Sequence, residues 1–228
     1  MTLALPRPLP ASGLGVGRIQ APPEIQLEEQ KQPRIWPPHE AFYIEAMLFC
    51  LHSLESSLIQ ANRLMDTIGD WPDEDHQFEA GISSILDQFQ NIAAQAAALS
   101  RFLWPSRNSS VHSARASQIR KALSVSDDSP LKNRALRNLM EHFDERLDIY
   151  LSEGIAGNII PCHIGPSPIE HEVPTHFFRA YYWDTREFEA LGERYEMKPI
   201  LDETARIHNE LIRCANEGFR LHPAAGEQ

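Results

Sequence analysis

The sequence predicts a mainly α-helical protein: an antiparallel helical bundle with a proline-rich arm before it and a β-hairpin and one additional helix after it. Two observations predict the bundle. Apolar residues recur at three- and four-residue spacing over several long segments, and short turn segments separate them. A third observation, aromatic runs on either side of a "DT" dipeptide at residues 184–185, predicts the hairpin.

The length of 228 residues suits one domain with extra arms. We divide the chain into an arm (1–38), a helical bundle (39–154) and a C-terminal region (155–220) of loop, hairpin and last helix packed on the bundle. The arm is rich in proline and has no hydrophobic period, so we expect it to be extended or disordered. Its "GLGVG" segment lies between prolines and lacks the preceding strand that a phosphate-binding loop needs.

Two long helices open the predicted bundle. The first begins after Trp36 and ends before Gly69, and the second ends near Trp104. A short turn joins them, so they pack as antiparallel partners. Their apolar positions are Ile44, Met47, Leu48, Leu51, Leu54, Leu58, Ala61, Met65 and Ile68, followed by Phe78, Ile82, Ile85, Phe89, Ile92, Ala96, Leu99 and Leu103.

A third, shorter helix is predicted within residues 111–124, and a fourth over residues 131–151. Ser129 would cap the fourth helix, Pro130 would occupy its first position, and the helix would end near Gly154. On this interpretation four helices pack as a bundle.

The C-terminal region begins with a long loop to about residue 175, because glycine, proline and histidine are frequent there. A β-hairpin over residues 176–197 follows. The last helix covers about residues 199–216, and its predicted core residues are Ile200, Ala205, Ile207, Leu211 and either Cys214 or Ala215.

Composition favours a soluble protein of the cytoplasm. Hydrophobic residues make up 42% and charged residues 23% of the chain, and we expect no apolar run long enough to span a bilayer. The first ten residues do not form a secretory signal. The three cysteines, Cys50, Cys162 and Cys214, have unrelated spacings that favour reduced thiols.

The charge of the chain is uneven. The net charge is -11, which argues against indiscriminate binding to nucleic acid. Residues 101–137, however, carry a net charge of +6, whereas residues 38–100 and residues 138–228 each carry -9. This basic segment is either a solvated face or an anion-binding site.

The basic segment runs into the predicted fourth helix, which carries Arg137, Asn138 and His142 away from its apolar stripe. Such a set can cleave a phosphodiester: an imidazole exchanges a proton near neutral pH, a guanidinium stabilises charge on phosphate oxygens, and an amide orients either group. The alternative is that Arg137 pairs with Glu141 and that Asn138 and His142 are ordinary surface polar groups. On a continuous helix Arg137 and His142 point about 140° apart, so two copies facing across a dyad would be needed to combine them.

The segment "RNLMEH" at residues 137–142 resembles the signature of the HEPN superfamily, small helical-bundle proteins of which many are ribonucleases of toxin and antiviral systems. The flanking "LRNLMEHFDERLD" is similar to uncharacterised bacterial proteins of this type, and the resemblance covers about residues 40–153. An arginine followed by histidine at this spacing also occurs at Arg34 and Arg107, but only Arg137 lies on a long predicted helix.

The resemblance implies a homodimer in which Arg137, Asn138 and His142 of both chains flank the scissile phosphate of an RNA. It implies attack by the RNA 2′-hydroxyl without a metal or cofactor, in a bacterial stress or phage-defence setting, with a neutralising antitoxin protein as a further expected partner. No membrane association is expected. The predicted substrate-binding residues are the nearby cations Arg120, Lys121, Lys132 and Arg134.

Three alternatives remain open at this stage. The protein could be a non-catalytic dimeric interaction or scaffold module in which the motif serves as polar contacts at the dimer interface. The loop segment supplies zinc-type ligands in Cys162, His163, His171 and His176, although their spacing matches no standard zinc module. The aromatic run at residues 181–183 could stack on bases, but we favour core packing.

Overall fold

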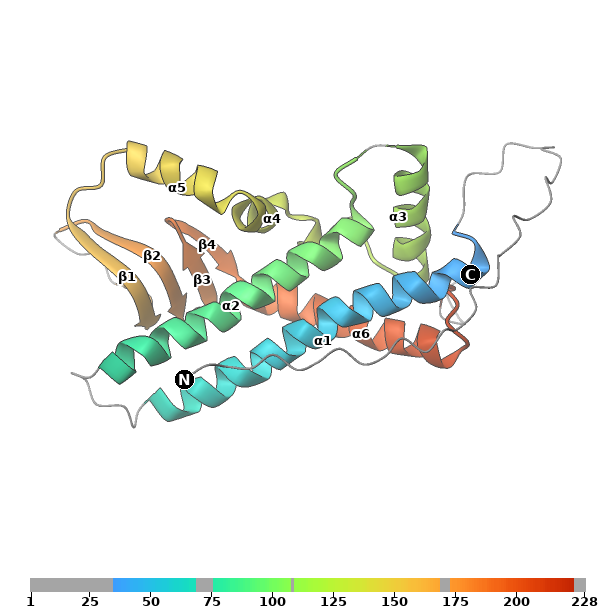
Figure 1. Ribbon diagram of the computed structural model, residues 1–228, viewed down its shortest axis with the longest axis horizontal. Helices are drawn as coiled ribbons and strands as arrows, with labels where there is room; N and C mark the ends of the chain where they lie inside the picture. Colours follow the sequence, from blue (N-terminus) through green and yellow to red (C-terminus); the bar gives the residue numbers. More distant parts are fainter. Residues whose placement is uncertain (1–34, 69–75, 108, 169–172, 224–228) are drawn as a thin grey trace, which may run out of the picture. The chain divides into compact units, whose positions relative to one another are not determined.

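The computed structural model describes residues 35–68, 76–107, 109–168 and 173–223, so residues 1–34 of the predicted arm lie outside it. Within these ranges the chain is a mixed α and β protein, in which long helices pack against a four-stranded sheet (Figure 1). The prediction of a mainly α, HEPN-like bundle with only a β-hairpin is therefore wrong. The reason lies in residues 131–165, which divide between two short helices and an additional strand.

The two long helices are confirmed. Helix α1 (Pro37–Thr67) and helix α2 (His76–Leu103) lie side by side in Figure 1. Proline is tolerated at the start of α1 because the first helical N–H groups have no partner within the helix. The buried residues follow the predicted three- and four-residue spacing, with Ile44 and Met47 on α1 and Ile85 and Ile92 on α2 fully buried.

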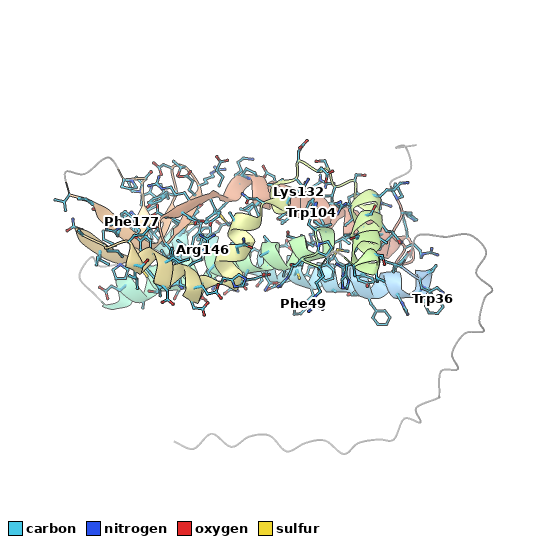
Figure 2. The ribbon with its side chains drawn as sticks, turned by 90° about the horizontal axis from the view of Figure 1, so that it is seen from above. Trp36, Phe49, Trp104, Lys132, Arg146 and Phe177 are labelled. Atoms are coloured by element: carbon cyan, nitrogen blue, oxygen red, sulfur yellow. The ribbon has the colours of Figure 1, made fainter. Side chains whose placement is uncertain are left out.

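Among the described helices, α1 alone is long and apolar enough to cross a membrane by length and composition, which corrects the expectation that no segment reaches that length. A third of its apolar window (33%) is buried. The inner face packs against α2 and helix α6 (Met197–Asn216). On the outer face Phe42 and Phe49 are exposed, and Figure 2 shows Phe49. On its inner face α1 is therefore packed against other helices of the fold.

The short third helix is also confirmed, as α3 (Ser110–Ala122). The hydroxyl oxygen of Ser109 caps it by accepting a hydrogen bond from the backbone N–H of His112 at 3.4 Å. The apolar side of α3 is narrow, and Ala116, Ile119 and Ala122 are its buried residues.

The predicted continuous helix over residues 131–151 is wrong. Pro130–Lys132 form one turn of 3-10 helix, α4 covers Arg134–Glu141, and α5 covers Phe143–Ser152. His142 separates the two helices, with φ -129° and ψ 41°. The cap of α4 is Asn133, whose side-chain oxygen accepts the N–H of Ala135 at 2.8 Å, whereas the predicted cap, Ser129, donates its hydroxyl to Glu203 at 2.9 Å.

The sheet has the order β1-β2-β3-β4. Strand β1 (Asn158–Gly165) pairs in parallel with β2 (Thr175–Tyr182), and β3 (Glu187–Ala190) and β4 (Glu193–Glu196) continue the sheet in antiparallel pairs. The predicted turn at residues 184–185 does join two strands, but the prediction of a loop over residues 155–175 is wrong because β1 occupies eight of them. The strand was not predicted because its sequence, "NIIPCHIG", contains proline and glycine, which are uncommon within strands.

The second strand of the predicted hairpin is in fact two strands, β3 and β4, joined by a turn. Leu191 and Gly192 have φ of 51° and 77°, and their neighbours Ala190 and Glu193 are paired across the ladder. Two successive positive φ values between paired strands are the geometry of a tight type I′ turn. This turn was not predicted because leucine rarely adopts the left-handed region of backbone φ and ψ angles.

One face of the sheet packs against α2 and α5. The ring of Tyr181 on β2 stacks on Phe89 of α2, with centroids 3.8 Å apart, and Phe178 contacts Phe143 of α5 edge to face at 5.6 Å. These contacts place residues of both predicted regions, 39–154 and 155–220, in one hydrophobic core. On the other face Phe177 (Figure 2), Ala180 and Tyr182 form a smaller buried cluster.

Helix α6 confirms most of the predicted last helix. Ile200, Ile207, Leu211 and Cys214 are buried against the core as expected, but Ala205 is exposed and Thr204 is buried in its place. The hydroxyl of Thr204 donates to the backbone oxygen of Leu201 at 2.9 Å, which satisfies the buried polar group.

A buried carboxylate joins the two ends of the described chain. Glu40 on α1 is only 3% exposed, and its oxygens accept hydrogen bonds from Arg220 Nε and the backbone N–H of Leu221, both at 2.8 Å. A third bond comes from the Gln118 amide on α3 at 3.1 Å. One side chain therefore holds α1, α3 and the segment after α6 together.

We expect Glu40→Ala to lower the free energy of unfolding by about 1–3 kcal/mol, because the buried N–H of Leu221 loses its acceptor. Urea denaturation followed by circular dichroism measures this difference. Glu45→Ala, an exposed carboxylate on the same helix, is the matched control and should leave stability nearly unchanged. Equal stabilities for the two variants would contradict this role of Glu40.

A half-buried histidine predicts pH-dependent stability. The His163 ring on β1 lies 5.1 Å from Phe177 and 5.9 Å from Tyr182, centroid to centroid. Burial lowers the pKa of His163 below its ordinary 6.5, although a hydrogen bond to the Pro166 backbone and the charge of Glu189 act in the opposite direction. Protonation therefore favours the unfolded chain, and this contribution to stability is present above pH 6.5 and lost as the pH falls through the folded pKa.

We expect the wild-type protein to lose more unfolding free energy than His163→Asn when the pH is lowered from about 7.5 to about 5.5, because the variant lacks the titrating group. Urea denaturation at both pH values measures the two losses. His39→Asn, which removes an exposed histidine, should behave as wild type. An equal loss in wild type and His163→Asn would show that another group causes the pH dependence.

Candidate functional site

The three predicted catalytic residues lie at the junction of α4 and α5. Arg137 and Asn138 are on α4, and His142 is the non-helical residue between the helices. The backbone N–H of His142 donates to the Asn138 carbonyl at 3.0 Å, so these two residues are fixed one turn apart. The angle of about 140° between Arg137 and His142 assumed a continuous helix, and it does not apply across this break.

The break arises because the two helices bind different parts of the fold. Helix α4 packs on α2 through buried Leu139, and at its end Glu141 accepts a hydrogen bond from Arg101 Nη1 at 2.7 Å. Helix α5 packs on the sheet through Phe143 and through an ion pair between Arg146 (Figure 2) and Glu193 at 2.9 Å. These two attachments hold His142 between them in a non-helical conformation.

A second attachment secures the far end of α5. The Tyr150 hydroxyl lies 3.2 Å from His176 Nδ1 on β2, and His176 Nε2 lies 3.1 Å from the Ala156 carbonyl. His176 can satisfy both contacts in one neutral tautomer, since one ring nitrogen donates and the other accepts. Helix α5 is therefore tied to the sheet at its first and last turns.

The imidazole of His142 is accessible and has a carboxylate beside it. The His142 side chain is 53% exposed, and its Nδ1 lies 3.6 Å from Oε2 of Glu145, one turn further along α5. At 3.6 Å between two exposed side chains this contact is an ion pair when the imidazole is protonated and not a hydrogen bond, so Glu145 is a neighbouring carboxylate that does not fix the His142 tautomer. An accessible imidazole of this kind can serve as a general acid or base. Sequence analysis missed Glu145, although its spacing of three residues from His142 was a readable signal.

The other motif side chains are less fully described. Asn138 is half-buried on α4. The side chains of Arg134 and Arg137 lie outside the described part of the chain, and their backbones belong to the first and second turns of α4.

The remaining predicted substrate-binding cations have different surroundings. Lys132 (Figure 2) is exposed and pairs with Asp127 at 3.2 Å, a contact that lowers the pKa of that carboxyl group. Lys121 is exposed on α3. Arg120 donates to the backbone oxygen of Leu103 and lies over the Trp104 ring at 5.7 Å, so it caps the end of α2 and ties α3 to it.

Two cations that the sequence did not single out lie near the junction. Arg101 reaches it through Glu141, as described above. Arg179 on β2 is held between the rings of Phe143 and Phe178, with its guanidinium carbon 4.8 and 4.6 Å from their centroids. Burial lowers the pKa of Arg179, against the opposing charges of Cys162 and Asp87. Only the fold brings these arginines close to residues 141–143, so no local sequence pattern could have found them.

The basic segment also forms a surface depression of about 360 Å³, which we call the α2–α3 hollow. It lies where α2 ends and α3 begins, and its charged lining residues are Arg101, Arg107, His112 and Arg115. A second cavity of about 290 Å³ lies between α2, β4 and the start of α6. Two of its polar groups are already bonded, since Ser100 donates to the Leu131 carbonyl at 2.7 Å and the Tyr195 hydroxyl donates to Glu193 at 2.6 Å.

The structure does not gather the zinc-type ligands. Cys162 lies beside Ser83 of α2, whereas His163 lies among the aromatic rings on the other face of the sheet and His176 bonds Tyr150. Among the described residues no group of three histidine, cysteine or acidic side chains is close enough to hold a metal, and His171 lies outside those residues.

The preference for core packing of the aromatic run is confirmed for two of its three residues. Tyr181 and Tyr182 are buried, and the Tyr182 hydroxyl donates to buried Glu189 at 2.9 Å. Burial and the charge of Glu189 raise the pKa of Tyr182 above its ordinary 10.0. Trp183 is half-exposed at the end of β2.

Comparison of the chain with protein-family models, with curated protein sequences and with solved structures finds no significant match. The case for a function therefore depends on the residues and geometry described above.

Proposed function

We propose that the protein is a metal-independent RNA endonuclease that acts as a dimer, with a composite site of Arg137, Asn138 and His142. The observation that carries this proposal is the break between α4 and α5, which leaves the His142 imidazole accessible with Glu145 at its Nδ1. The sequence resemblance to HEPN ribonucleases supports the same three residues. The proposal does not depend on a four-helix bundle.

The residues suit transfer of a phosphoryl group within RNA. In this reaction the 2′-oxygen forms a bond to phosphorus and the bond to the 5′-oxygen breaks, leaving a 2′,3′-cyclic phosphate and a 5′-hydroxyl. His142 would take the proton of the attacking hydroxyl or give one to the leaving oxygen. Arg137 would stabilise the charge on the phosphate oxygens, and Asn138 would orient the phosphate or the imidazole.

The surface of α5 supports the dimer. Ile149 and Leu151 are large apolar residues that stay 57% and 54% exposed, so this part of α5 lacks a covering element among the described residues. Covering such residues is a common role of a symmetric interface. A dyad beside α5 would bring two copies of His142 toward one substrate, one as base and one as acid.

The same apolar residues favour a second candidate function, a non-catalytic dimeric interaction module. On that interpretation Ile149 and Leu151 form the interface, and Asn138 and His142 are polar contacts within it. The two functions differ in one measurable respect, because only the nuclease cleaves RNA.

We expect purified protein to cleave end-labelled single-stranded RNA in the presence of a chelator, leaving cyclic phosphate ends, and His142→Ala to lower the rate about 10²- to 10⁴-fold by removing general acid–base catalysis. The measurement is the rate of product formation on a denaturing gel. His222→Ala, which removes an exposed histidine after α6, is the matched control and should cleave as wild type. Absence of cleavage by the wild-type protein on several RNAs would favour the interaction module.

Glu145 is a positioning residue in this proposal, because it acts through His142. We expect Glu145→Gln to lower kcat about two- to fivefold with little change in KM, the size of effect that an exposed ion pair supports, because a protonated His142 loses its neighbouring carboxylate. Asp148→Asn, which removes another exposed carboxylate of α5, should change neither quantity. A Glu145→Gln enzyme with the wild-type kcat would exclude this role.

A further inference from the structure

The α2–α3 hollow combines positive charge with an apolar floor. Three arginines line it, Arg101 from α2, Arg107 from the connection and Arg115 from α3, together with His112 of α3. Its remaining lining residues are mainly apolar: Ala98, Phe102, Pro105 and Ser106. The volume of about 360 Å³ lies at the lower end of the range for small-molecule sites, about 300–1,000 Å³. The hollow is thus large enough for one nucleotide unit.

Arg115 lines the hollow with a guanidinium that two aromatic rings and one backbone carbonyl hold in place. Its guanidinium lies 5.9 Å from the centroid of the Tyr43 ring and 6.0 Å from that of Phe102, and its Nη2 donates to the Arg101 carbonyl at 3.2 Å. Its Nε is buried and has no hydrogen-bond partner. Because this Nε is closed off from solvent, an anion in the open hollow would instead meet the terminal nitrogens of the guanidinium.

Arg107 supplies a second available cation. It is exposed, and it makes no hydrogen bond or ion pair with the described residues. Of the lining arginines, Arg101 already bonds the carboxylate of Glu141. Several guanidinium groups around one depression match the oxygens of a phosphate, which arginine binds with paired hydrogen bonds.

We propose that the α2–α3 hollow binds one nucleotide of single-stranded RNA, with its phosphate on Arg107 and Arg115 and its base on Phe102 and Pro105. Stacking on an aromatic ring and contact with backbone phosphate together are the usual means of binding single strands without sequence preference. The choice of RNA as the ligand rests on the proposed nuclease function. The hollow would then be a substrate-binding subsite separate from the cleavage site.

The position of the hollow fits this role. Arg101 lines it and also holds Glu141, and Glu141 is the residue before His142. The hollow and the α4–α5 junction therefore have Arg101 as a common neighbour. Of the predicted substrate-binding residues whose side chains are described, Arg120, Lys121 and Lys132 do not line the hollow.

The first test locates the nucleotide. Full-length His142→Ala protein with ¹³C-labelled alanine methyl groups is titrated with uridine monophosphate, and methyl resonances are followed by NMR. We expect the Ala98 methyl to shift, since Ala98 lines the hollow, and the Ala190 methyl on β3 to stay in place. Inorganic phosphate should shift Ala98 less, because it lacks a base to stack on Phe102. An unmoved Ala98 at saturating nucleotide overturns the proposal.

The second test measures the contribution of one cation. Binding of a short fluorescein-labelled oligouridine to His142→Ala protein is followed by anisotropy at several salt concentrations. Adding Arg107→Gln should raise Kd about three- to tenfold and flatten the slope of log K against log salt by about 0.7, the value for one phosphate contact to a single strand. Adding Arg63→Gln instead, which removes an exposed cation on α1, should change neither quantity. Equal Kd values for the two variants overturn the proposal.

Neither test depends on cleavage, because both use the His142→Ala protein. If the wild-type protein cleaves RNA but the Ala98 methyl resonance does not shift, the proposed nuclease function is retained and the proposed subsite is rejected. If Ala98 moves and Arg107→Gln weakens binding while wild type does not cleave, the hollow is a nucleotide site on a non-catalytic protein.

Discussion

The candidate site depends on the attachment of one chain segment to two different elements. Glu141 is held to α2 by Arg101, and two residues later Phe143 is held to the sheet by Phe178 and Arg179. The chain makes these two attachments with two separate short helices, and the non-helical residue between them is His142. Because each attachment uses partners far away in the sequence, the conformation of the motif is a property of the whole fold and not of residues 137–142 alone.

The contact between Phe89 and Tyr181 makes this arrangement possible. It stacks α2 directly on β2, so the helix that holds α4 and the sheet that holds α5 share one core. In the same core the rings of Phe143 and Phe178 flank the guanidinium of Arg179, whose Nε is buried without a hydrogen-bond partner. Cation–π contacts with Phe143 and Phe178 offset part of the cost of burying that charge. The sheet is therefore the support of the site, although it carries none of the predicted catalytic residues.

The sequence predicted the parts of this fold that local pattern determines. Regular apolar spacing identifies α1, α2 and α6, and Ala205 is misplaced only because the buried face of α6 uses Thr204. Strand β1 and the turn at Leu191 were missed because their residues contradict local propensity and are stabilised by pairing with distant strands. The same holds for the site: His142 and Glu145 are readable from spacing, whereas Arg101 and Arg179 join it only through tertiary contacts.

The structure also separates the basic segment into groups with different tasks. Arg120 caps α2 and Lys132 neutralises Asp127, so part of the positive charge stabilises the connections around α3. Arg101, Arg107 and Arg115 remain around the α2–α3 hollow, next to the α4–α5 junction. The segments before and after residues 101–137 in the sequence are acidic, and salt screens the attraction of the basic residues for an anion beyond about 10 Å. A chain with a net charge of -11 can therefore offer a local site for a phosphate while repelling nucleic acid elsewhere on its surface.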